Sequence, residues 1–338
     1  MKAMILERTG VIEPDTQPLR LVELPKPKPG PDEILVEVRT CGVCHTELDE
    51  IEGRAAPPTL PVIPGHEVVG YVIERGAKVE RLALGARVGV GWIHHSSGSA
   101  DENLSPAFRA TGRDVDGGYA EFIKVPEAYA YPVPDAFSDA AAAPLLCAGG
   151  VGYRALRLTD IKNGQRLGLT GFGGSAHLVL QLARHLYPDS AISVFARDQA
   201  SREFAREIGA EWAGAIEDRA PQPLDAIIDT TPAWKPVVEA LANLKPGGRL
   251  VINAIRKEER DKDALLSLSY HDHLWLEKEI KSVANVTHRD LAAFLPLAAE
   301  ARIAPEIETY PLAEANQALI DLKFRPVRGA KVLQIGQP

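Results

Sequence analysis

Three side chains that bind transition metals well occur in three separate short motifs. Cys44 lies in TCGVCHTEL, His66 in PVIPGHEVVG and Cys147 in PLLCAGGVG. Two thiolates and an imidazole from different loops suit a catalytic zinc site, which has three protein ligands and one position open to the substrate. The chain lacks the two closely spaced ligand pairs of a zinc finger. The motifs therefore predict a catalytic metal centre rather than a structural finger.

The cysteines also allow other interpretations. Cys41 and Cys44 form a C-x-x-C pair, which is typical of redox-active thiols in some folds. Cys147 taken alone would usually be a small buried apolar residue. Spacing by itself leaves both alternatives open beside the zinc interpretation.

A glycine-rich turn, LGLTGFGGSAHL, follows the apolar run Arg166–Thr170 and opens a predicted helix that ends at Leu186. Gly171 permits a tight turn, and Gly173 lets a pyrophosphate approach the backbone. The helix N-terminus then offers free N–H groups and a positive dipole. A turn of this kind can be purely structural, but this one lies among alternating strands and helices, so we expect dinucleotide binding. The residues predicted to bind the cofactor here are Gly171, Gly173, Gly174 and Ser175.

The end of the next predicted strand, Ile192–Ala196, bears on the choice of cofactor. An NAD site usually has an acidic residue there, which accepts a hydrogen bond from the ribose 2′-OH. This chain has Ala196 at that position, followed by Arg197, which can pair with a 2′-phosphate. NADP(H) is therefore favoured over NAD(H). In the alternative, Arg197 is a solvated charge and Asp198 binds the ribose.

The elements that must position these residues fall into two kinds. In the N-terminal part, short apolar runs such as Glu33–Val38 and Val68–Glu74 are broken by Pro and Gly, which predicts a β-rich domain. Beyond it, a helix is predicted over Ala140–Leu158, and strands then alternate with helices, as in parallel βαβ units. The tail returns to a mixed pattern, with a helix at Ala313–Leu322 and a strand at Lys331–Ile335.

Length and composition agree with a two-domain globular protein. The chain has 338 residues, and its formal net charge of −8 argues against binding to nucleic acids or acidic membranes. Three cysteines are too few for a disulfide scaffold and indicate a reducing compartment. The start of the chain, MKAMILERTG, lacks the apolar stretch of a signal peptide, and the longest weakly polar run, Ala140–Tyr153, is too short for a membrane helix. We expect a cytoplasmic protein.

Taken together, the motifs resemble those of one enzyme family. The segments GVCHTEL, PGHEVVG, DVDGGYAEF, LLCAGGVGYRAL and GFGGSAH are similar to those of the zinc-dependent alcohol dehydrogenases of the medium-chain dehydrogenase/reductase superfamily. The resemblance covers essentially the whole chain, in the family's order. It implies an α/β protein in which a GroES-like β-rich catalytic domain, residues 1–145 and 288–338, flanks a Rossmann domain with a doubly wound parallel sheet, residues 146–287.

The resemblance also assigns the metal ligands. It makes Cys44, His66 and Cys147 the ligands of one catalytic Zn²⁺, and it makes Cys41 a bystander, because the family ligand is the cysteine directly before the His-Thr pair. The zinc would polarise the substrate oxygen while hydride moves between the substrate carbon and the nicotinamide.

Four further residues receive roles from the resemblance, each with a plainer alternative. Glu67 would be a catalytic carboxylate behind the metal, or else a buried ion-pair partner. Thr46 would hydrogen-bond the substrate oxygen, or else cap a helix N-terminus. His45 and Arg328 would lie near the cofactor phosphates, or else be surface charges.

The chain departs from the family pattern in the segment Trp92–Gly112. Many members bind a structural zinc there with four cysteines, but this segment has none, and Ser97 and Ser105 stand where ligands would be. A serine hydroxyl is a poor zinc ligand, so we expect one zinc per chain and no structural zinc. Four side chains could build a substitute site, although a solvated loop is the stronger expectation: His94, His95, Asp101 and Glu102.

Three more positions bear on proton transfer and on the substrate. Asp49 replaces the relay histidine of several members, so the proton route would run from Thr46 through cofactor hydroxyls and water. Glu47 replaces a commoner aspartate, and the longer side chain could shift its hydrogen bond to a ligand. Trp92 resembles the aromatic residue of the family's substrate pocket, which would favour small primary alcohols and aldehydes; core packing is the alternative.

The sequence thus predicts a zinc-dependent oxidoreductase that transfers a hydride between an alcohol/aldehyde pair and NAD(P)(H). The family implies a homodimer or homotetramer. Two alternatives stay open: a metal-free quinone or enoyl reductase of the same superfamily, and a non-catalytic cofactor-binding protein.

Overall fold

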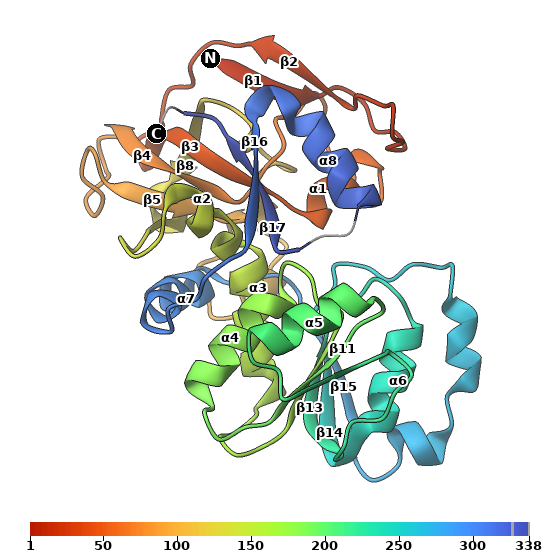
Figure 1. Ribbon diagram of the computed structural model, residues 1–338. Helices are drawn as coiled ribbons and strands as arrows, with labels where there is room; N and C mark the ends of the chain where they lie inside the picture. The colour runs from red at the N-terminus through yellow and green to blue at the C-terminus, as the bar shows by residue number, and fades with distance from the viewer. Residues whose placement is uncertain (326–327, 337–338) are drawn as a thin grey trace. The chain divides into compact units, whose positions relative to one another are not determined.

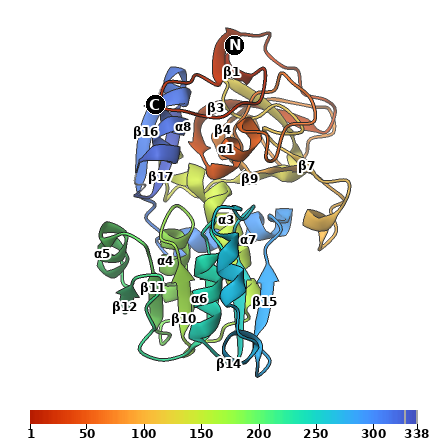
Figure 2. The same ribbon diagram turned by 90° about the vertical axis from the view of Figure 1, so that its right-hand side faces the viewer.

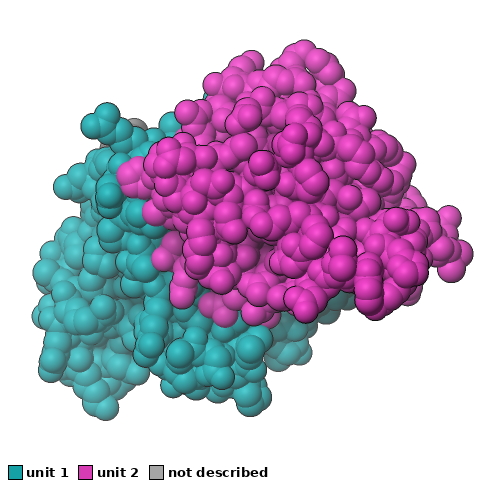
Figure 3. All heavy atoms as spheres, turned by 90° about the horizontal axis from the view of Figure 1, so that it is seen from below, with its two compact units in different colours: residues 1–150, 286–338 teal, residues 151–285 magenta. Residues whose placement is uncertain are grey.

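The computed structural model describes residues 1–325 and 328–336 of the chain. They form two compact units, the first of residues 1–150 with 286–338 and the second of residues 151–285 (Figure 3). Relative to the predicted boundaries, residues 146–150 and 286–287 belong to the first unit. The reason is local packing, because the short helix η3 (Ala143–Leu146) lies against strands of the first unit and against helix α7 (His288–Glu300).

The first unit is built on a seven-stranded sheet in the order β16-β17-β3-β4-β5-β9, with β8 paired to β3 (Figure 1). Strand β17 near the C-terminus runs antiparallel to β3, so the tail of the chain completes a sheet begun far upstream. The strands of this sheet are β3 (Glu33–Val43), β4 (Val68–Arg75), β5 (Arg87–Val90), β8 (Phe122–Pro126), β9 (Ala130–Pro132), β16 (Ile307–Pro311) and β17 (Ala330–Gln334).

Smaller elements complete the first unit. Two strand pairs lie outside the main sheet, β1 (Lys2–Leu6) with β2 (Leu19–Glu23) and β6 (Ile93–His95) with β7 (Arg109–Ala110). The helices are α1 (His45–Ile51), α2 (Asp139–Ala142), α7, α8 (Ala315–Phe324) and the short turns η1 (Glu102–Leu104), η2 (Glu127–Tyr129), η3 and η6 (Leu312–Glu314).

The single helix predicted over Ala140–Leu158 is wrong. The segment contains α2, η3 and then α3 (Ala148–Thr159), with Cys147 between the last two. Pro144 cannot donate an intrahelical hydrogen bond, and Cys147, at φ −128° and ψ −75°, leaves the helical region. The break puts Cys147 in a turn rather than on a helix face.

The second unit is a six-stranded parallel sheet in the order β12-β11-β10-β13-β14-β15 (Figures 1 and 2). Numbered from β10, this is the strand order 3-2-1-4-5-6 of a Rossmann fold. The strands are β10 (Leu167–Thr170), β11 (Ile192–Phe195), β12 (Trp212–Gly214), β13 (Leu224–Asp229), β14 (Leu244–Ile252) and β15 (Glu279–Ser282). The helices are α3, α4 (Ala176–Leu186), α5 (Gln199–Glu207), α6 (Lys235–Asn243) and the short turns η4 (Lys262–Ser267) and η5 (Tyr270–Leu274).

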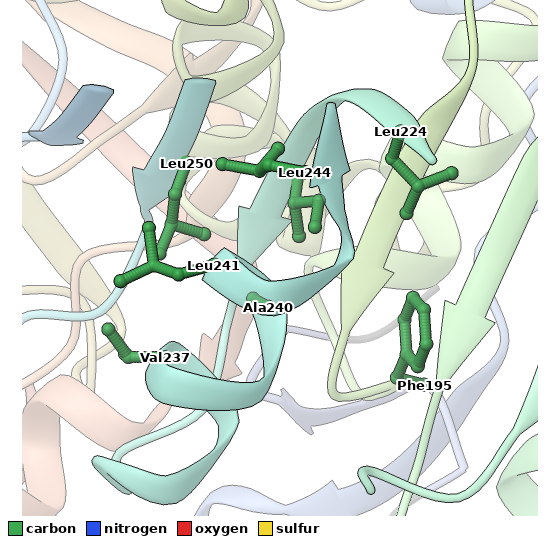
Figure 4. Close-up of a cluster of buried hydrophobic side chains, with 8 residues drawn as sticks. Phe195, Leu224, Val237, Ala240, Leu241, Leu244 and Leu250 are labelled. Atoms are coloured by element: carbon green, nitrogen blue, oxygen red, sulfur yellow. The ribbon is translucent and has the colours of Figure 1, made fainter. Parts of the chain in front are cut away.

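The core of the second unit shows why these segments are strands and helices. Short runs such as ISVF in β11 are buried throughout, as expected for parallel strands covered on both faces. The apolar face of helix α6 packs in a cluster of buried side chains to which Val237, Ala240 and Leu241 belong (Figure 4). The buried members of this cluster are Phe195, Leu224, Ile227, Val237, Ala240, Leu241, Leu244 and Leu250.

Among the described residues, no helix is both long and apolar enough to cross a lipid bilayer.

The cluster leads to a test of the core. Leu250 is fully buried on β14, so Leu250→Ala removes buried methyl groups and leaves a cavity. We expect it to lower the free energy of unfolding of the second unit by about 2–5 kcal/mol, measured by urea denaturation. Leu266→Ala is the matched control, because Leu266 is 89% exposed and its loss should change stability by no more than about 0.5 kcal/mol. Equal effects of the two substitutions would contradict this description of the core.

Candidate metal centre

Four side chains of the first unit converge on one small volume. The ligand atoms of Cys44, His66, Glu67 and Cys147 all lie within 4.8 Å of one another. The two sulfur atoms are 4.0 Å apart. His66 and Glu67 are buried, whereas the two cysteines are half-buried. The structure thus brings together the side chains that the separate motifs carry, and Cys41 lies outside the cluster, in the core.

Cys44 is held by the start of helix α1. It is the N-cap residue, and its Sγ accepts a hydrogen bond from the backbone N–H of Thr46 at 3.4 Å. In return, Glu47 Oε2 accepts from the backbone N–H of Cys44 at 2.8 Å, which completes a capping box. The alternative role of Thr46 as the helix cap is therefore wrong. Thr46 is buried within the helix, and its Oγ1 lies 3.4 Å from Cys44 Sγ.

The second oxygen of Glu47 positions the imidazole. Glu47 Oε1 lies 2.5 Å from His66 Nδ1, and both side chains are fully buried. A carboxylate that holds one ring nitrogen fixes the tautomer and the orientation of the other. The imidazole also forms a hydrogen bond with the side chain of Cys44. One carboxylate thus orients two potential ligands, Cys44 and His66.

Glu67 fits into space left by a glycine. A Cβ atom on Gly42 would lie 1.7 Å from Glu67 Oε2, so any larger residue at position 42 would displace this carboxylate. Burial raises the pKa of Glu67, and a hydrogen bond with the backbone of Ala148 opposes the rise. The charged groups that shift its pKa most are Cys44, His66 and Glu47, with no Lys or Arg among them, which argues against the alternative that it is an ion-pair partner.

The electrostatics of the cluster are those of a cation site. A hydrogen bond from the Cys147 thiol to the Cys44 sulfur lowers the pKa of Cys44, and the same bond raises the pKa of Cys147. Burial opposes a charge on His66, but the neighbouring Glu47 and Cys44 together raise its pKa. Buried sulfurs and carboxylates that crowd together are costly unless a cation compensates them. Two thiolates and an imidazole are donors that zinc prefers, so the donor set fits this metal.

An aromatic and an acidic residue lie beside the cluster. The ring centroid of Trp92 is 6.1 Å from that of His66 and 5.6 Å from that of Phe108. The indole is half-buried and donates from Nε1 to Glu50 Oε1 at 3.3 Å. The sequence pattern does not single out Glu50. The only available signal was a second acidic residue three positions after Glu47, on the same side of a helix.

Asp49 is not free to act as a relay. It is buried, and its Oδ1 lies 2.6 Å from Arg54 Nε. This ion pair holds the carboxylate in a structural role, which agrees with a proton route that bypasses position 49.

The glycine turn lies in the second unit. Gly171 has φ +79°, and a Cβ atom there would come within 2.8 Å of Thr230 Oγ1. Gly173 has open space where a Cβ would be. Ser175 precedes α4 without a side-chain cap, and its Oγ accepts from Asn253 Nδ2 at 3.2 Å. The backbone N–H groups of His177 and Leu178 in the first turn of α4 donate to the carbonyl groups of Gly173 and Ser175, at 3.3 and 3.1 Å.

The end of β11 carries more positive charge than the sequence motif suggests. Arg197 is exposed, whereas Asp198 caps α5 by accepting from the backbone N–H and the hydroxyl of Ser201, each at 2.8 Å. Arg202, which the motif does not include, donates to the carbonyl groups of Ala196 and Arg197 at 2.8 and 3.0 Å. The Arg202 guanidinium group thus lies at the strand end, next to the exposed Arg197, and Asp198 is used as a cap.

His45 and Arg328 are both exposed residues of the first unit. His45 is the first residue of α1. Arg328 lies 3.7 Å from Glu306. Neither belongs to the four-residue cluster, and their placement near cofactor phosphates stays a prediction.

The cysteine-free segment contains a buried carboxylate rather than a metal cluster. Glu102 is fully buried and accepts four hydrogen bonds, from the His288 backbone N–H at 2.6 Å, His288 Nδ1 at 2.5 Å, the Tyr129 hydroxyl at 2.9 Å and the Gly98 N–H at 3.1 Å. His94 is also buried, which lowers its pKa to about 4. The expectation of a solvated loop is therefore wrong for these two residues. Within the described ranges they join no metal-ligand cluster.

The fold and the site define a medium-chain dehydrogenase/reductase, with a GroES-like unit and a Rossmann unit. Residues 30–135 match the family model of the alcohol dehydrogenase GroES-like domain. The chain is 43% identical to a probable alcohol dehydrogenase AdhA of Mycobacterium tuberculosis, over 99% of this chain and 97% of that protein. It is 31% identical to an alcohol dehydrogenase of Geobacillus stearothermophilus, over 97% and 99%.

Solved structures agree with these relatives. A cinnamyl alcohol dehydrogenase from Sorghum bicolor superposes with a TM-score of 0.82 at 26% identity, covering 98% of this chain and 97% of that one. The alcohol dehydrogenase of Aeropyrum pernix has a TM-score of 0.83 at 23% identity, covering 99% and 100%, and shares the fold. The chain belongs to the alcohol dehydrogenase family, as the sequence motifs predict.

The Glu102 contacts lead to a prediction for the cysteine-free segment. Glu102→Gln removes the charge that four donors share, and it turns an NH₂ group toward them. Because hydrogen bonds to a charged group are worth about 1.5–3 kcal/mol each, we expect the thermal midpoint to fall by at least about 3 °C in differential scanning calorimetry. Asp101→Asn changes an exposed neighbour and should leave the midpoint unchanged. The interpretation fails if the two variants melt alike.

Proposed function

We propose that the chain is a zinc-dependent, NAD(P)-linked alcohol dehydrogenase, which transfers a hydride between an alcohol/aldehyde pair and a nicotinamide cofactor. The observation that carries the proposal is the convergence of Cys44, His66 and Cys147, with Glu67, within 4.8 Å. Membership of the alcohol dehydrogenase family supports it. The intact ligand set argues against a metal-free quinone or enoyl reductase and against a non-catalytic protein.

Cys44, His66 and Cys147 would hold the zinc and leave one coordination position open to substrate. When bound, the metal supplies Lewis acidity, which favours loss of the hydroxyl proton of an alcohol and polarises the carbonyl of an aldehyde. Gly171, Gly173 and Gly174 would hold the cofactor, and its nicotinamide would serve as hydride acceptor or donor.

The chain's own residues orient the reactants and move the proton. Thr46 Oγ1, 3.4 Å from Cys44 Sγ, would accept the hydroxyl proton of the alcohol and release its own hydroxyl proton to a route through cofactor hydroxyls and water. Glu47 binds the Nδ1 side of the His66 ring, so that Nε2, on the opposite side of the ring, would be the ligand atom. Trp92, beside His66, would limit the width of the substrate site and favour small primary alcohols.

We propose NADP(H) as the preferred cofactor. Arg197 and Arg202 offer two cations near the end of β11, where a 2′-phosphate would lie. Asp198 is less suited to the ribose of NAD(H), because both of its carboxylate oxygens accept hydrogen bonds at the start of α5.

We also propose that the chain forms a homodimer or homotetramer and works in the cytoplasm. Strand β15 is an edge strand, and all four of its residues are exposed. Large apolar side chains near it are also exposed, which is typical of a protein–protein interface. These side chains are Tyr270, Leu274, Trp275, Leu276 and Ile280. Three free cysteines suit a reducing compartment.

The metal proposal predicts that the purified protein contains one zinc ion per chain, as measured by mass spectrometry. Cys44→Ala should bring this content close to zero and abolish NAD(P)H-linked turnover on a panel of alcohols and aldehydes. Cys41→Ala is the matched control, since Cys41 is a fully buried cysteine outside the cluster, and it should keep its zinc. Zinc retained by Cys44→Ala would remove the proposed site, and a content near two per chain would reveal a second one.

The cofactor proposal predicts a higher kcat/KM for NADP(H) than for NAD(H). Arg197→Ala and Arg202→Ala should each lower the NADP(H) value by about tenfold or more, because each removes a charge-assisted contact, and should leave the NAD(H) value nearly unchanged. Arg219→Ala, at a salt bridge with Glu239 in the same unit, serves as the control and should change neither value. A wild-type enzyme that prefers NAD(H) tenfold would overturn the proposal.

A further inference from the structure

Glu50 places a carboxyl group beside the metal cluster that the mechanism above does not use. It lies on α1, three residues after Glu47, and is 1% exposed. Its Oε1 accepts the hydrogen bond from Trp92 Nε1 at 3.3 Å. Its other oxygen, Oε2, is buried and has no hydrogen-bond partner among the residues that the structure describes. The carboxyl group thus has one hydrogen-bonded oxygen and one that is unpaired among the described residues.

A leftover oxygen of this kind is uncommon. Most buried side-chain oxygens in folded proteins have a partner, because an unpaired one loses its hydration without compensation. Burial, together with the nearby charge of Glu47, raises the pKa of Glu50. The neutral acid favoured by this environment can both donate and accept a hydrogen bond. Glu50 can therefore pair with either a hydroxyl or a carbonyl group of a bound molecule.

One helix spacing and one contact link Glu50 to the reaction centre. Thr46 is four residues before it on α1, and residues at this spacing project from the same face of a helix. Trp92, which Glu50 holds, has its ring centroid 6.1 Å from that of His66 and is half-buried. Glu50 therefore shares a helix face with the residue that would hydrogen-bond the substrate oxygen, and it contacts the aromatic side chain beside the ligand cluster.

We propose that Glu50 is a specificity-determining residue of the alcohol site. It fixes the Trp92 indole with one oxygen and offers the other to a polar group that the substrate carries beyond its reacting carbon. The preferred substrates are then short alcohols and aldehydes with a second hydroxyl or carbonyl group, rather than plain alkanols of the same size. This inference rests on the proposed function.

The physical basis is the difference between polar and apolar recognition. An apolar pocket distinguishes a methyl from a hydroxyl group only weakly. A site with a buried hydrogen-bonding group rejects the analogue that cannot pair with it much more strongly. Glu50 supplies such a group, and the specificity depends on whether the substrate carries a hydroxyl or carbonyl group that can hydrogen-bond to it.

The test compares pairs of substrates with the same number of non-hydrogen atoms. The pairs are ethane-1,2-diol with propan-1-ol, propane-1,3-diol with butan-1-ol, and butane-1,4-diol with pentan-1-ol. The zinc-loaded wild-type enzyme should have a diol-to-alkanol ratio of kcat/KM above one for at least one pair. In Glu50→Leu that ratio should fall by about tenfold or more. Glu50→Gln keeps an acceptor and a donor at this position, so it should retain most of the preference.

A binding measurement and a second variant separate direct contact from an effect through Trp92. Dissociation constants of each diol and alkanol, measured by isothermal titration calorimetry on the holoenzyme, should shift in the same direction as the kcat/KM ratios. Trp92→Phe removes the indole donor but leaves Glu50 in place, so the diol preference should persist. If Trp92→Phe loses the preference as completely as Glu50→Leu does, Glu50 does not contact the substrate, and the inference is overturned.

The remaining outcomes are also decisive. Ratios that stay within about twofold of wild type in Glu50→Leu, with the thermal midpoint maintained, would mean that another group such as water satisfies Oε2. That result would overturn this inference and leave the proposed function intact. A zinc-loaded wild-type enzyme without turnover on any alcohol or aldehyde would overturn both. If Glu50→Leu does not fold, the same comparison is made with Glu50→Met, which also lacks a hydrogen-bonding group. A ratio within about twofold of wild type in that variant would overturn the inference.

Discussion

A single buried carboxylate, Glu47, ties the start of helix α1 to the segment that carries His66. One oxygen accepts the backbone N–H of Cys44, and the other lies 2.5 Å from His66 Nδ1. Both contacts exclude water, so neither can be exchanged cheaply for hydration. The positions of Cys44 Sγ and His66 Nε2 depend on this one side chain. The glutamate is longer than the family's commoner aspartate, and its two oxygens reach two different segments of the chain.

The cluster around Glu47 concentrates groups that are unfavourable without a cation. Burial raises the pKa of Glu67, of Glu47 and of Glu50, and the pair of sulfurs shares a hydrogen bond at 4.0 Å. If stability alone mattered, well-packed apolar residues at these positions would serve as well or better. The arrangement is understandable as a site in which a divalent metal compensates the charge, and in which the remaining polar atoms serve the substrate.

The first unit also stabilises its cysteine-free segment by a different device. Glu102 accepts hydrogen bonds from three separate parts of the chain. These are its own loop through Gly98, the short turn η2 through Tyr129, and the start of α7 through His288. A buried charge with four donors connects these parts through hydrogen bonds, as a structural metal would through coordination. The loss of cysteines therefore does not leave the segment unanchored.

The sequence by itself predicted the two-domain α/β architecture and the glycine turn, because local motifs and the periodicity of apolar residues encode them. It offered Cys44, His66 and Cys147 as one ligand set only through the resemblance to a family, because their spacing also allowed other roles. It did not determine the break at Cys147, where Pro144 ends a pattern that otherwise predicts one helix. Only the tertiary structure decided the partners of Glu50 and Glu102. Each is an acidic residue of ordinary type, and its role depends on contacts such as Glu102 with His288, 186 positions apart. Such contacts form when the chain packs, and nothing in the neighbouring residues specifies them.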